Sequence, residues 1–131
     1  MKVIHQSGTR KTAVARATLV SGAGVIRVNS RLLSSLPDNM FRAKIEEPLL
    51  LAGDVAKKVN VSVSVAGGGS NSQAEATRLA IARALAIFDK KLHSKYLEYD
   101  RAFTVADVRR KETHKPNCHG KARAKRQKSY R

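Results

Sequence analysis

Aromatic side chains are scarce in this 131-residue sequence, which has no tryptophan, three phenylalanines and three tyrosines. Modules that read single-stranded RNA on a β-sheet stack the bases on several aromatic side chains. The scarcity therefore argues against base stacking as the main way of binding nucleic acid. Contact with phosphates is the mode that we expect instead.

Cysteine is almost absent, since Cys118 is the single cysteine of the sequence. One cysteine cannot form an intramolecular disulfide. The sequence also shows no cleavable signal sequence and no apolar run of the length that a membrane-spanning helix needs. We therefore expect a cytoplasmic protein that has no membrane partner.

Metal ligands are too few for a structural zinc site. His114, Cys118 and His119 lie within six residues of one another, and all three residue types can bind zinc. The other two histidines, His5 and His93, are distant in the sequence, whereas structural zinc takes four protein ligands. We predict no metal and no cofactor.

Acidic residues are few as well, with ten Asp or Glu against 26 Lys or Arg. They are scattered or fall within expected helices, and no Ser-His-Asp or Cys-His arrangement can be argued from their spacing. The sequence therefore predicts no catalytic residues and a protein that is not an enzyme.

Positive charge is what the sequence does have, with a formal net charge of +16. Residues 109–131 alone carry ten Lys or Arg, a single acid and almost nothing apolar. Such a block of one sign is typical of an arm that binds a polyanion. Fully stretched, it could span about 75 Å, well beyond the radius of a compact body. The alternative is a solvated tail that only aids solubility.

The rest of the chain, residues 1–108, has enough residues for one ordinary core and too few for two. Hydrophobic residues make up 42% of the whole sequence. We therefore predict a globular domain over residues 1–108 that binds RNA, and an extended basic tail over residues 109–131.

Strand patterns occupy the first part of this body. Residues 12–20 and 25–28 resemble two strands joined by a glycine-containing turn, which predicts a hairpin. Lys11, Arg16 and Arg27 lie on or beside it, and residues spaced by two share a face of a strand. Several cations could therefore line one side of the sheet.

Helical and strand patterns alternate in the second part. Asp38 is the expected N-cap of a helix that ends at Pro48, and residues 49–51 are expected to fill the core. Residues 59–65 alternate between valine and small polar residues, which predicts a half-buried strand. An apolar stripe over residues 74–92 predicts one long helix.

A glycine loop, residues 67–73, joins that strand to the long helix. This order brings free backbone N–H groups and the positive end of a helix together, which favours a phosphate. The loop lacks the endings and spacings of nucleotide-binding motifs, so a phosphotransferase is a weak interpretation. Alternatively, the three glycines serve only a tight turn or a close approach of backbones.

Six motifs follow one another along the chain: Gly8 to Ala17, Gly24 to Asn29, Glu47-Pro48-Leu49, Gly67-Gly68-Gly69 followed by Gln73-Ala74, Asp107-Val108-Arg109-Arg110, and the ending Gln127-Lys128-Ser129-Tyr130-Arg131. Together and in this order they resemble the motifs of ribosomal protein nine of the small subunit. The resemblance covers nearly the whole chain. The last two motifs are similar to the archaeal and eukaryotic branch, although residues 116–120 depart from the glycine- and proline-rich stretch of that branch.

The resemblance implies an α+β fold of the superfamily named for domain two of ribosomal protein five. This fold has a mixed sheet packed with helices and a left-handed β-α-β crossover, to which the family adds a long extended basic C-terminal tail. The implied function is that of a structural constituent of the small ribosomal subunit. It would bind rRNA in the head, beside other head proteins, and its tail would reach the anticodon stem-loop of the peptidyl-site tRNA.

The expected site residues are the cations and the glycine loop, taken from the charge pattern and the resemblance together. For rRNA they are Arg10, Lys11, Arg16, Arg27, Gly67, Gly68, Gly69, Ser70, Arg109, Arg110, Lys111, Lys115, Lys121, Arg123, Lys125 and Arg126. Near the tRNA, the resemblance places Lys128, Ser129, Tyr130 and Arg131.

Two other classes of protein stay open from the residues alone. One is a free-standing protein that condenses DNA or RNA through charge, which would need no ordered body motifs. The other is the phosphotransferase that would use the glycine loop.

Overall fold

The computed structural model describes residues 3–123 and 129–130. Its body contains a five-stranded mixed sheet in the order β1-β2-β5-β3-β4. The strands are β1 (Ile4–Arg10), β2 (Ala13–Ser21), β3 (Ile26–Val28), β4 (Arg31–Leu32) and β5 (Val59–Ala66). Strand β3 runs parallel to β5, and the other neighbouring pairs are antiparallel. The two longest predicted strands are confirmed.

The predicted hairpin between β2 and β3 is wrong, because β5 lies between these two strands. The connection after β2 instead crosses the start of β5, where the Gly22 N–H donates to the Lys58 carbonyl at 2.9 Å. The Asn60 side chain accepts from the backbone of Ala23 and Val25, at 2.9 and 3.0 Å. A turn-like sequence thus forms a link over an intervening strand, which local signals cannot reveal.

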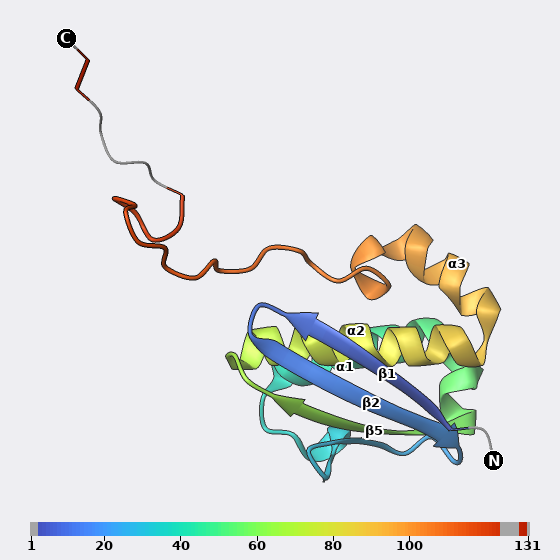
Figure 1. Cartoon of the computed structure of the whole chain (residues 1–131). Helices are drawn as coiled ribbons and strands as arrows, with labels where there is room; N and C mark the ends of the chain where they lie inside the picture. The colour runs from blue at the N-terminus through green and yellow to red at the C-terminus, as the bar shows by residue number, and fades with distance from the viewer. Residues whose placement is uncertain (1–2, 124–128, 131) are drawn as a thin grey trace.

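The described part of the chain has three α-helices, of which the first two lie over one face of the sheet and the third packs against them beyond its edge (Figure 1). They are α1 (Asn39–Ala52), α2 (Ser70–Phe88) and α3 (Lys90–Tyr99), and short 3-10 helices span Leu33–Ser35, Gly53–Lys58 and Arg101–Phe103. Alternate residues of β2 and β5 are buried beneath the helices, and in β2 most of these are alanines. Small side chains on this face let α2 pack close to the sheet.

Helix α1 begins as predicted but ends later. The Asp38 carboxylate accepts from the Met40 and Phe41 N–H groups at 3.0 and 3.1 Å, which confirms the N-cap. The expected end at Pro48 is wrong, because the helix continues to Ala52. Pro48 is buried, and its carbonyl accepts from the Tyr96 hydroxyl at 2.8 Å, so tertiary packing holds the helix together past the proline.

The leucines after Pro48 only partly fill the core. Leu49 and Leu51 pack against it, whereas Leu50 is 78% exposed.

The prediction of a single helix over residues 74–92 is also wrong. Helix α2 starts at Ser70 and ends at Phe88, and Asp89 then caps α3 by accepting from the Lys91 N–H at 3.0 Å.

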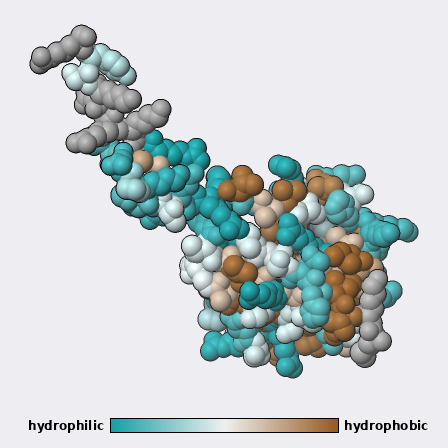
Figure 2. Space-filling model, in the orientation of Figure 1, coloured by the Kyte–Doolittle hydropathy of each residue, from teal (hydrophilic) through white to brown (hydrophobic). Residues whose placement is uncertain are grey.

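After Phe103 the chain runs along the body as far as the end of β1 and then leads away from it (Figure 1). Residues 104–123 contain no helix and only an isolated bridge at Cys118. Figure 2 shows that this described part of the tail is mostly hydrophilic. The domain boundary at residue 108 stays a prediction. Within the described residues, no helix has the length and apolar character needed to span a membrane.

Candidate nucleic-acid interface

The uncovered face of the sheet carries two exposed arginines. Arg16 on β2 lies opposite Ser64 of β5, and Arg27 on β3 lies opposite Ser62 of the same strand. Because Ser62 and Ser64 are two residues apart, both arginines belong to one face. Within the described ranges neither arginine forms an ion pair. This face therefore offers two cations among small hydroxyl side chains.

Lys11 and the glycine loop lie at one end of this sheet. Lys11 is exposed in the two-residue turn between β1 and β2, with a positive φ of 53°. A Cβ on Gly67 would lie 2.6 Å from the Thr12 carbonyl oxygen, and one on Gly68 would lie 3.1 Å from the Ala13 Cβ. The first two positions thus need glycine because the loop passes very close to the start of β2. This is the alternative raised from the sequence, in which the glycines serve a close approach of backbones.

The third glycine of the loop has a different place. Gly69 is the N-cap of α2 and has no neighbouring atom within 4 Å of an added Cβ. Its carbonyl accepts from the Gln73 N–H at 2.9 Å, and Ser70 after it is exposed. The positive end of α2 therefore opens to solvent close to the Lys11 turn.

Arg10 is held by carboxylates instead of facing solvent. Its Nε lies 2.6 Å from a Glu75 oxygen, its Nη1 contacts Asp107, and its side chain is only 18% exposed. Glu75 also pairs with Lys44 at 3.2 Å. Asp107 in turn accepts from the Arg109 backbone N–H at 2.8 Å and from Arg109 Nη2 at 2.6 Å. Two of the residues predicted to bind RNA, Arg10 and Arg109, are thus already paired within the chain.

The pKa directions in this cluster agree with its geometry. The hydrogen bonds from Arg109 hold the pKa of Asp107 far below its usual range, and the charge of Arg10 acts in the same direction. For Glu75, burial raises the pKa, but the hydrogen bonds from Lys44 and Arg10 outweigh it and leave the pKa lowered. Both carboxylates are therefore ionised at neutral pH. The cluster lines a groove of about 500 Å³ between α2 and residues 105–109.

A second set of contacts fixes the segment before the tail. Phe103 is fully buried and stacks on Tyr96 with ring centroids 5.2 Å apart. The Arg78 guanidinium lies 3.9 Å from the centroid of the Phe103 ring and pairs with Asp100 at 3.1 Å. Arg83 donates to the Thr104 carbonyl at 3.0 Å. The chain is thus anchored as far as Thr104.

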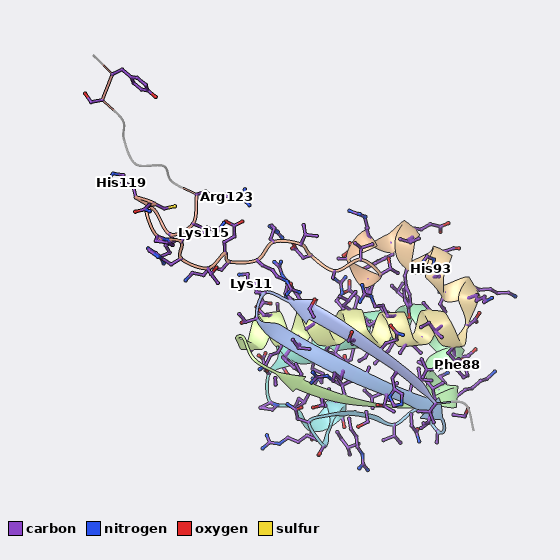
Figure 3. The ribbon with its side chains drawn as sticks, viewed as in Figure 1. Lys11, Phe88, His93, Lys115, His119 and Arg123 are labelled. Carbon is purple, nitrogen blue, oxygen red and sulfur yellow. The ribbon has the colours of Figure 1, made fainter. Side chains whose placement is uncertain are left out.

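The tail is not extended between Glu112 and Arg123, because it folds back into a loop. Arg123 donates twice to Glu112, at 3.0 and 2.5 Å, and the Lys115 N–H donates to the Lys121 carbonyl at 2.9 Å. Figure 3 shows Lys115, His119 and Arg123 together on this loop, away from the body. Asn117 has a positive φ of 63°, which an asparagine in a turn tolerates. The single acid of the tail thus closes a turn that charge counting does not predict.

The remaining predicted residues have varied positions. Arg110 donates to the Thr9 hydroxyl at 3.2 Å, and Lys111, Ser129 and Tyr130 are exposed. Lys125, Arg126, Lys128 and Arg131 lie outside the described residues. Across the described ranges, no three His, Cys, Asp or Glu side chains come together as metal ligands would. The absence of a metal and of a cofactor stays a prediction.

Several exposed cations are not among the residues that we predicted to bind RNA. They are Lys90, Lys91 and Lys95 on α3, together with Arg31 and Arg101. The pattern of α3 could have indicated them, because its buried positions Leu92 and Tyr96 are four residues apart and leave the lysines outside. The prediction of one helix over residues 74–92 concealed this separate helix.

An α/β body that is covered on one sheet face, with arginines on the other face and a cationic segment at its end, is typical of a basic RNA-binding protein. The sequence model of the family "Ribosomal protein S9/S16" matches residues 8–131. The chain is 46% identical over 134 residues to the small ribosomal subunit protein uS9 of Methanococcus maripaludis strain C7, and 45% identical to that of Methanococcus vannielii. Both alignments cover 100% of each chain. The chain belongs to the ribosomal protein S9/S16 family.

This membership confirms the resemblance that the six motifs carry, and the relatives are archaeal, in agreement with the archaeal and eukaryotic branch that the last two motifs resemble. It also confirms that the chain is a structural protein of translation and not an enzyme, which removes the phosphotransferase alternative. As a ribosomal protein, it acts in the cytoplasm.

Proposed function

We propose that the chain is a structural constituent of the small ribosomal subunit that binds rRNA in the head and reaches the anticodon stem-loop of the peptidyl-site tRNA with its tail. The full-length match to relatives named as small-subunit proteins is the observation that carries this proposal. Its other partners in this proposal are the neighbouring proteins of the head.

The body binds rRNA through the uncovered sheet face and the adjoining end of α2. Arg16 and Arg27 lie on that face, and a guanidinium can make two parallel hydrogen bonds to a phosphate. Hydroxyls such as those of Ser62 and Ser64 can bond to phosphates or to ribose 2′-hydroxyls. Lys11 and residues 67–70 of the glycine loop extend this surface around the end of the sheet where β1 meets β2.

The tail adds cations that bind phosphates and therefore do not depend on the base sequence of the RNA. The cations that contact rRNA phosphates along the path of the tail are Arg110, Lys111, Lys115, Lys121, Arg123, Lys125 and Arg126. Arg109 contacts rRNA as well, in addition to its pair with Asp107. The last four residues, from Lys128 to Arg131, lie beside the tRNA. Because phosphate contacts orient a partner without reading its sequence, the tail can hold every tRNA alike.

The body belongs to the superfamily named for domain two of ribosomal protein five. The sheet order β1-β2-β5-β3-β4 and the helices on a single face support this assignment. The parallel connection from β3 through α1 to β5 is then the left-handed crossover of that superfamily.

The contact with tRNA is tested by replacing Lys128 and Arg131 with glutamine in reconstituted small subunits. These replacements remove the charge at constant length, so we expect a weaker affinity for peptidyl-site tRNA and a smaller salt dependence. Replacing Arg42 and Lys57 with glutamine is the matched control, because it also removes two cations, which pair with Glu46 and Asp54 at 3.6 and 2.9 Å in the body. An unchanged affinity in the tail variant would show that the tail end does not contact the tRNA.

The sheet face is tested by replacing Arg16 and Arg27 with glutamine. Each lost phosphate contact lowers the slope of log affinity against log salt by roughly 0.7–0.9, so we expect a total change of about 1.4–1.8. The control replaces Arg42 and Lys57, two cations that are paired with carboxylates nearby in the sequence. An equal change in the control would favour binding by net charge alone, as in a condensing protein.

A further inference from the structure

We propose that Arg10 and Asp107 are positioning residues that fix the direction in which the tail leaves the body. This inference rests on the proposed function, in which the tail has a defined target. It gives Arg10 a role within the chain in place of the RNA contact expected from its charge. The two residues are 97 positions apart in the sequence and meet only through the fold.

The side of this contact that belongs to the body is rigid. Arg10 is the last residue of β1, and its guanidinium is also bound by Glu75 of α2 at 2.6 Å. Glu75 is in turn bound by Lys44 of α1 at 3.2 Å. A strand and two helices thus hold the arginine in place before the tail is considered.

The side that belongs to the tail is fastened at several adjacent points. Asp107 receives the Arg10 guanidinium and also folds Arg109 onto itself, through the Arg109 N–H at 2.8 Å and its Nη2 at 2.6 Å. Arg110 then reaches the Thr9 hydroxyl at 3.2 Å. Residues 107–110 are therefore fastened along the end of β1, beside the Lys11 turn.

The next fixed point toward the N-terminus is the peptide between Thr104 and Val105, whose carbonyl accepts from Arg83 at 3.0 Å and whose N–H donates to the Arg101 carbonyl at 3.1 Å. Without Asp107, the described contact that remains between this peptide and Lys111 is the exposed bond from Arg110 to Thr9, and one such bond contributes only about 1 kcal/mol, too little to hold the segment in one direction. A flexible segment of seven residues has a root-mean-square span of about 15 Å. Loss of the contact would therefore allow the tail to leave the body in a wide range of directions instead of one.

The cluster sits at the surface and outside the core, so its role in direction can be separated from stability. Among its members, Asp107 and Glu75 keep 25% and 31% of their side chains exposed. The buried ring of Phe103 anchors the segment before the tail independently of Asp107. We therefore expect variants of Asp107 to fold.

The test measures the distance distribution between spin labels in the full-length protein. One label is placed on Lys111→Cys in the tail and the other on Ser94→Cys of α3, in a Cys118→Ser background. The parent protein should give a narrow distribution. Asp107→Asn should broaden it by about 15 Å, the span of the freed segment. Arg10→Gln should broaden it as well and serves as a second variant.

Two controls isolate the ion pair. Asp107→Glu keeps the charge and should retain most of the narrow distribution. Asp54→Asn makes the same chemical change in an exposed pair on the 3-10 helix Gly53–Lys58 and should change nothing. The proposal is overturned if Asp107→Asn leaves the distribution as narrow as in the parent, or if the parent is already as broad as the variant.

The affinity for peptidyl-site tRNA separates this inference from the proposed function. A broadened distribution with unchanged tRNA affinity in reconstituted subunits would support the positioning role and contradict the role of the tail at the tRNA. An unchanged distribution would overturn the positioning role even if replacing Lys128 and Arg131 weakened tRNA binding.

Discussion

Substitution of Gly8 by alanine should destabilise the body through a clash between β1 and α2. Gly8 is a buried residue of β1, and a Cβ added there would lie 2.2 Å from the Ala76 carbonyl oxygen and 2.7 Å from the Ala80 nitrogen. Both are backbone atoms of α2, so no side-chain rotation can relieve the contact. The helix itself would have to move back by roughly 1 Å to restore an ordinary contact distance.

The magnitude follows from two opposing effects. Overpacking of a well-packed core costs about 1–3 kcal/mol. Alanine also restricts the unfolded chain, which returns about 0.4–1 kcal/mol. The net loss in the free energy of unfolding is therefore about 1–2 kcal/mol, which for a domain of this size lowers Tm by roughly 5–15 °C.

Thermal and urea unfolding of the full-length protein, followed by circular dichroism, measure this loss. Gly69→Ala is the matched control, because nothing lies within 4 Å of its added Cβ. As a change at an N-cap it should cost no more than about 1 kcal/mol. If Gly8→Ala were no less stable than Gly69→Ala, the close contact between β1 and α2 would be refuted. A retreat of α2 would also move Glu75 away from Arg10. The distance distribution between the spin labels at positions 94 and 111 should therefore broaden in Gly8→Ala too.

Three further changes have expected outcomes. Tyr96→Phe removes the hydrogen bond to the Pro48 carbonyl and should cost about 1 kcal/mol in urea unfolding; an unchanged midpoint would contradict the bond. Asp38→Ala removes the N-cap of α1 and should also cost about 1 kcal/mol, whereas Asp38→Asn should keep most of the stability. The pKa of Asp107 is lowered in the folded protein, so its contact with Arg10 should be complete above about pH 4 and lost only as the pH falls below that value. Spin-label distances at a series of pH values check this, and loosening between pH 7 and 5 would point to another group.

Local features of the fold could be predicted because their causes are neighbours in the sequence. The alternation in residues 59–65 indicated β5, and the Asp38 carboxylate reaches N–H groups two and three residues ahead of it. The failures share the opposite cause. The turn after β2 crosses β5, and α1 passes Pro48 because Tyr96 packs against it, contacts that depend on residues 35 or more positions away.

The candidate site divides in the same way. The abundance of cations in the tail and the order of the family motifs can be read from the sequence. The loop that Glu112 and Arg123 close could not be foreseen, since either residue could have paired elsewhere in a segment so rich in charge. The cations on α3, by contrast, could have been indicated by the spacing of Leu92 and Tyr96, but the prediction of one helix over residues 74–92 concealed them.

The sequence by itself determined that the protein is basic, that its charge lies mostly at one end, and which family it belongs to. These properties depend on composition and on the order of motifs, neither of which folding alters. Only the tertiary structure decided which cations are available to a partner. Arg16 and Arg27 stay exposed on the open sheet face, while Arg10 meets Glu75 and Asp107 from 65 and 97 residues away. An ion pair depends on distance in space, and the fold alone sets that distance.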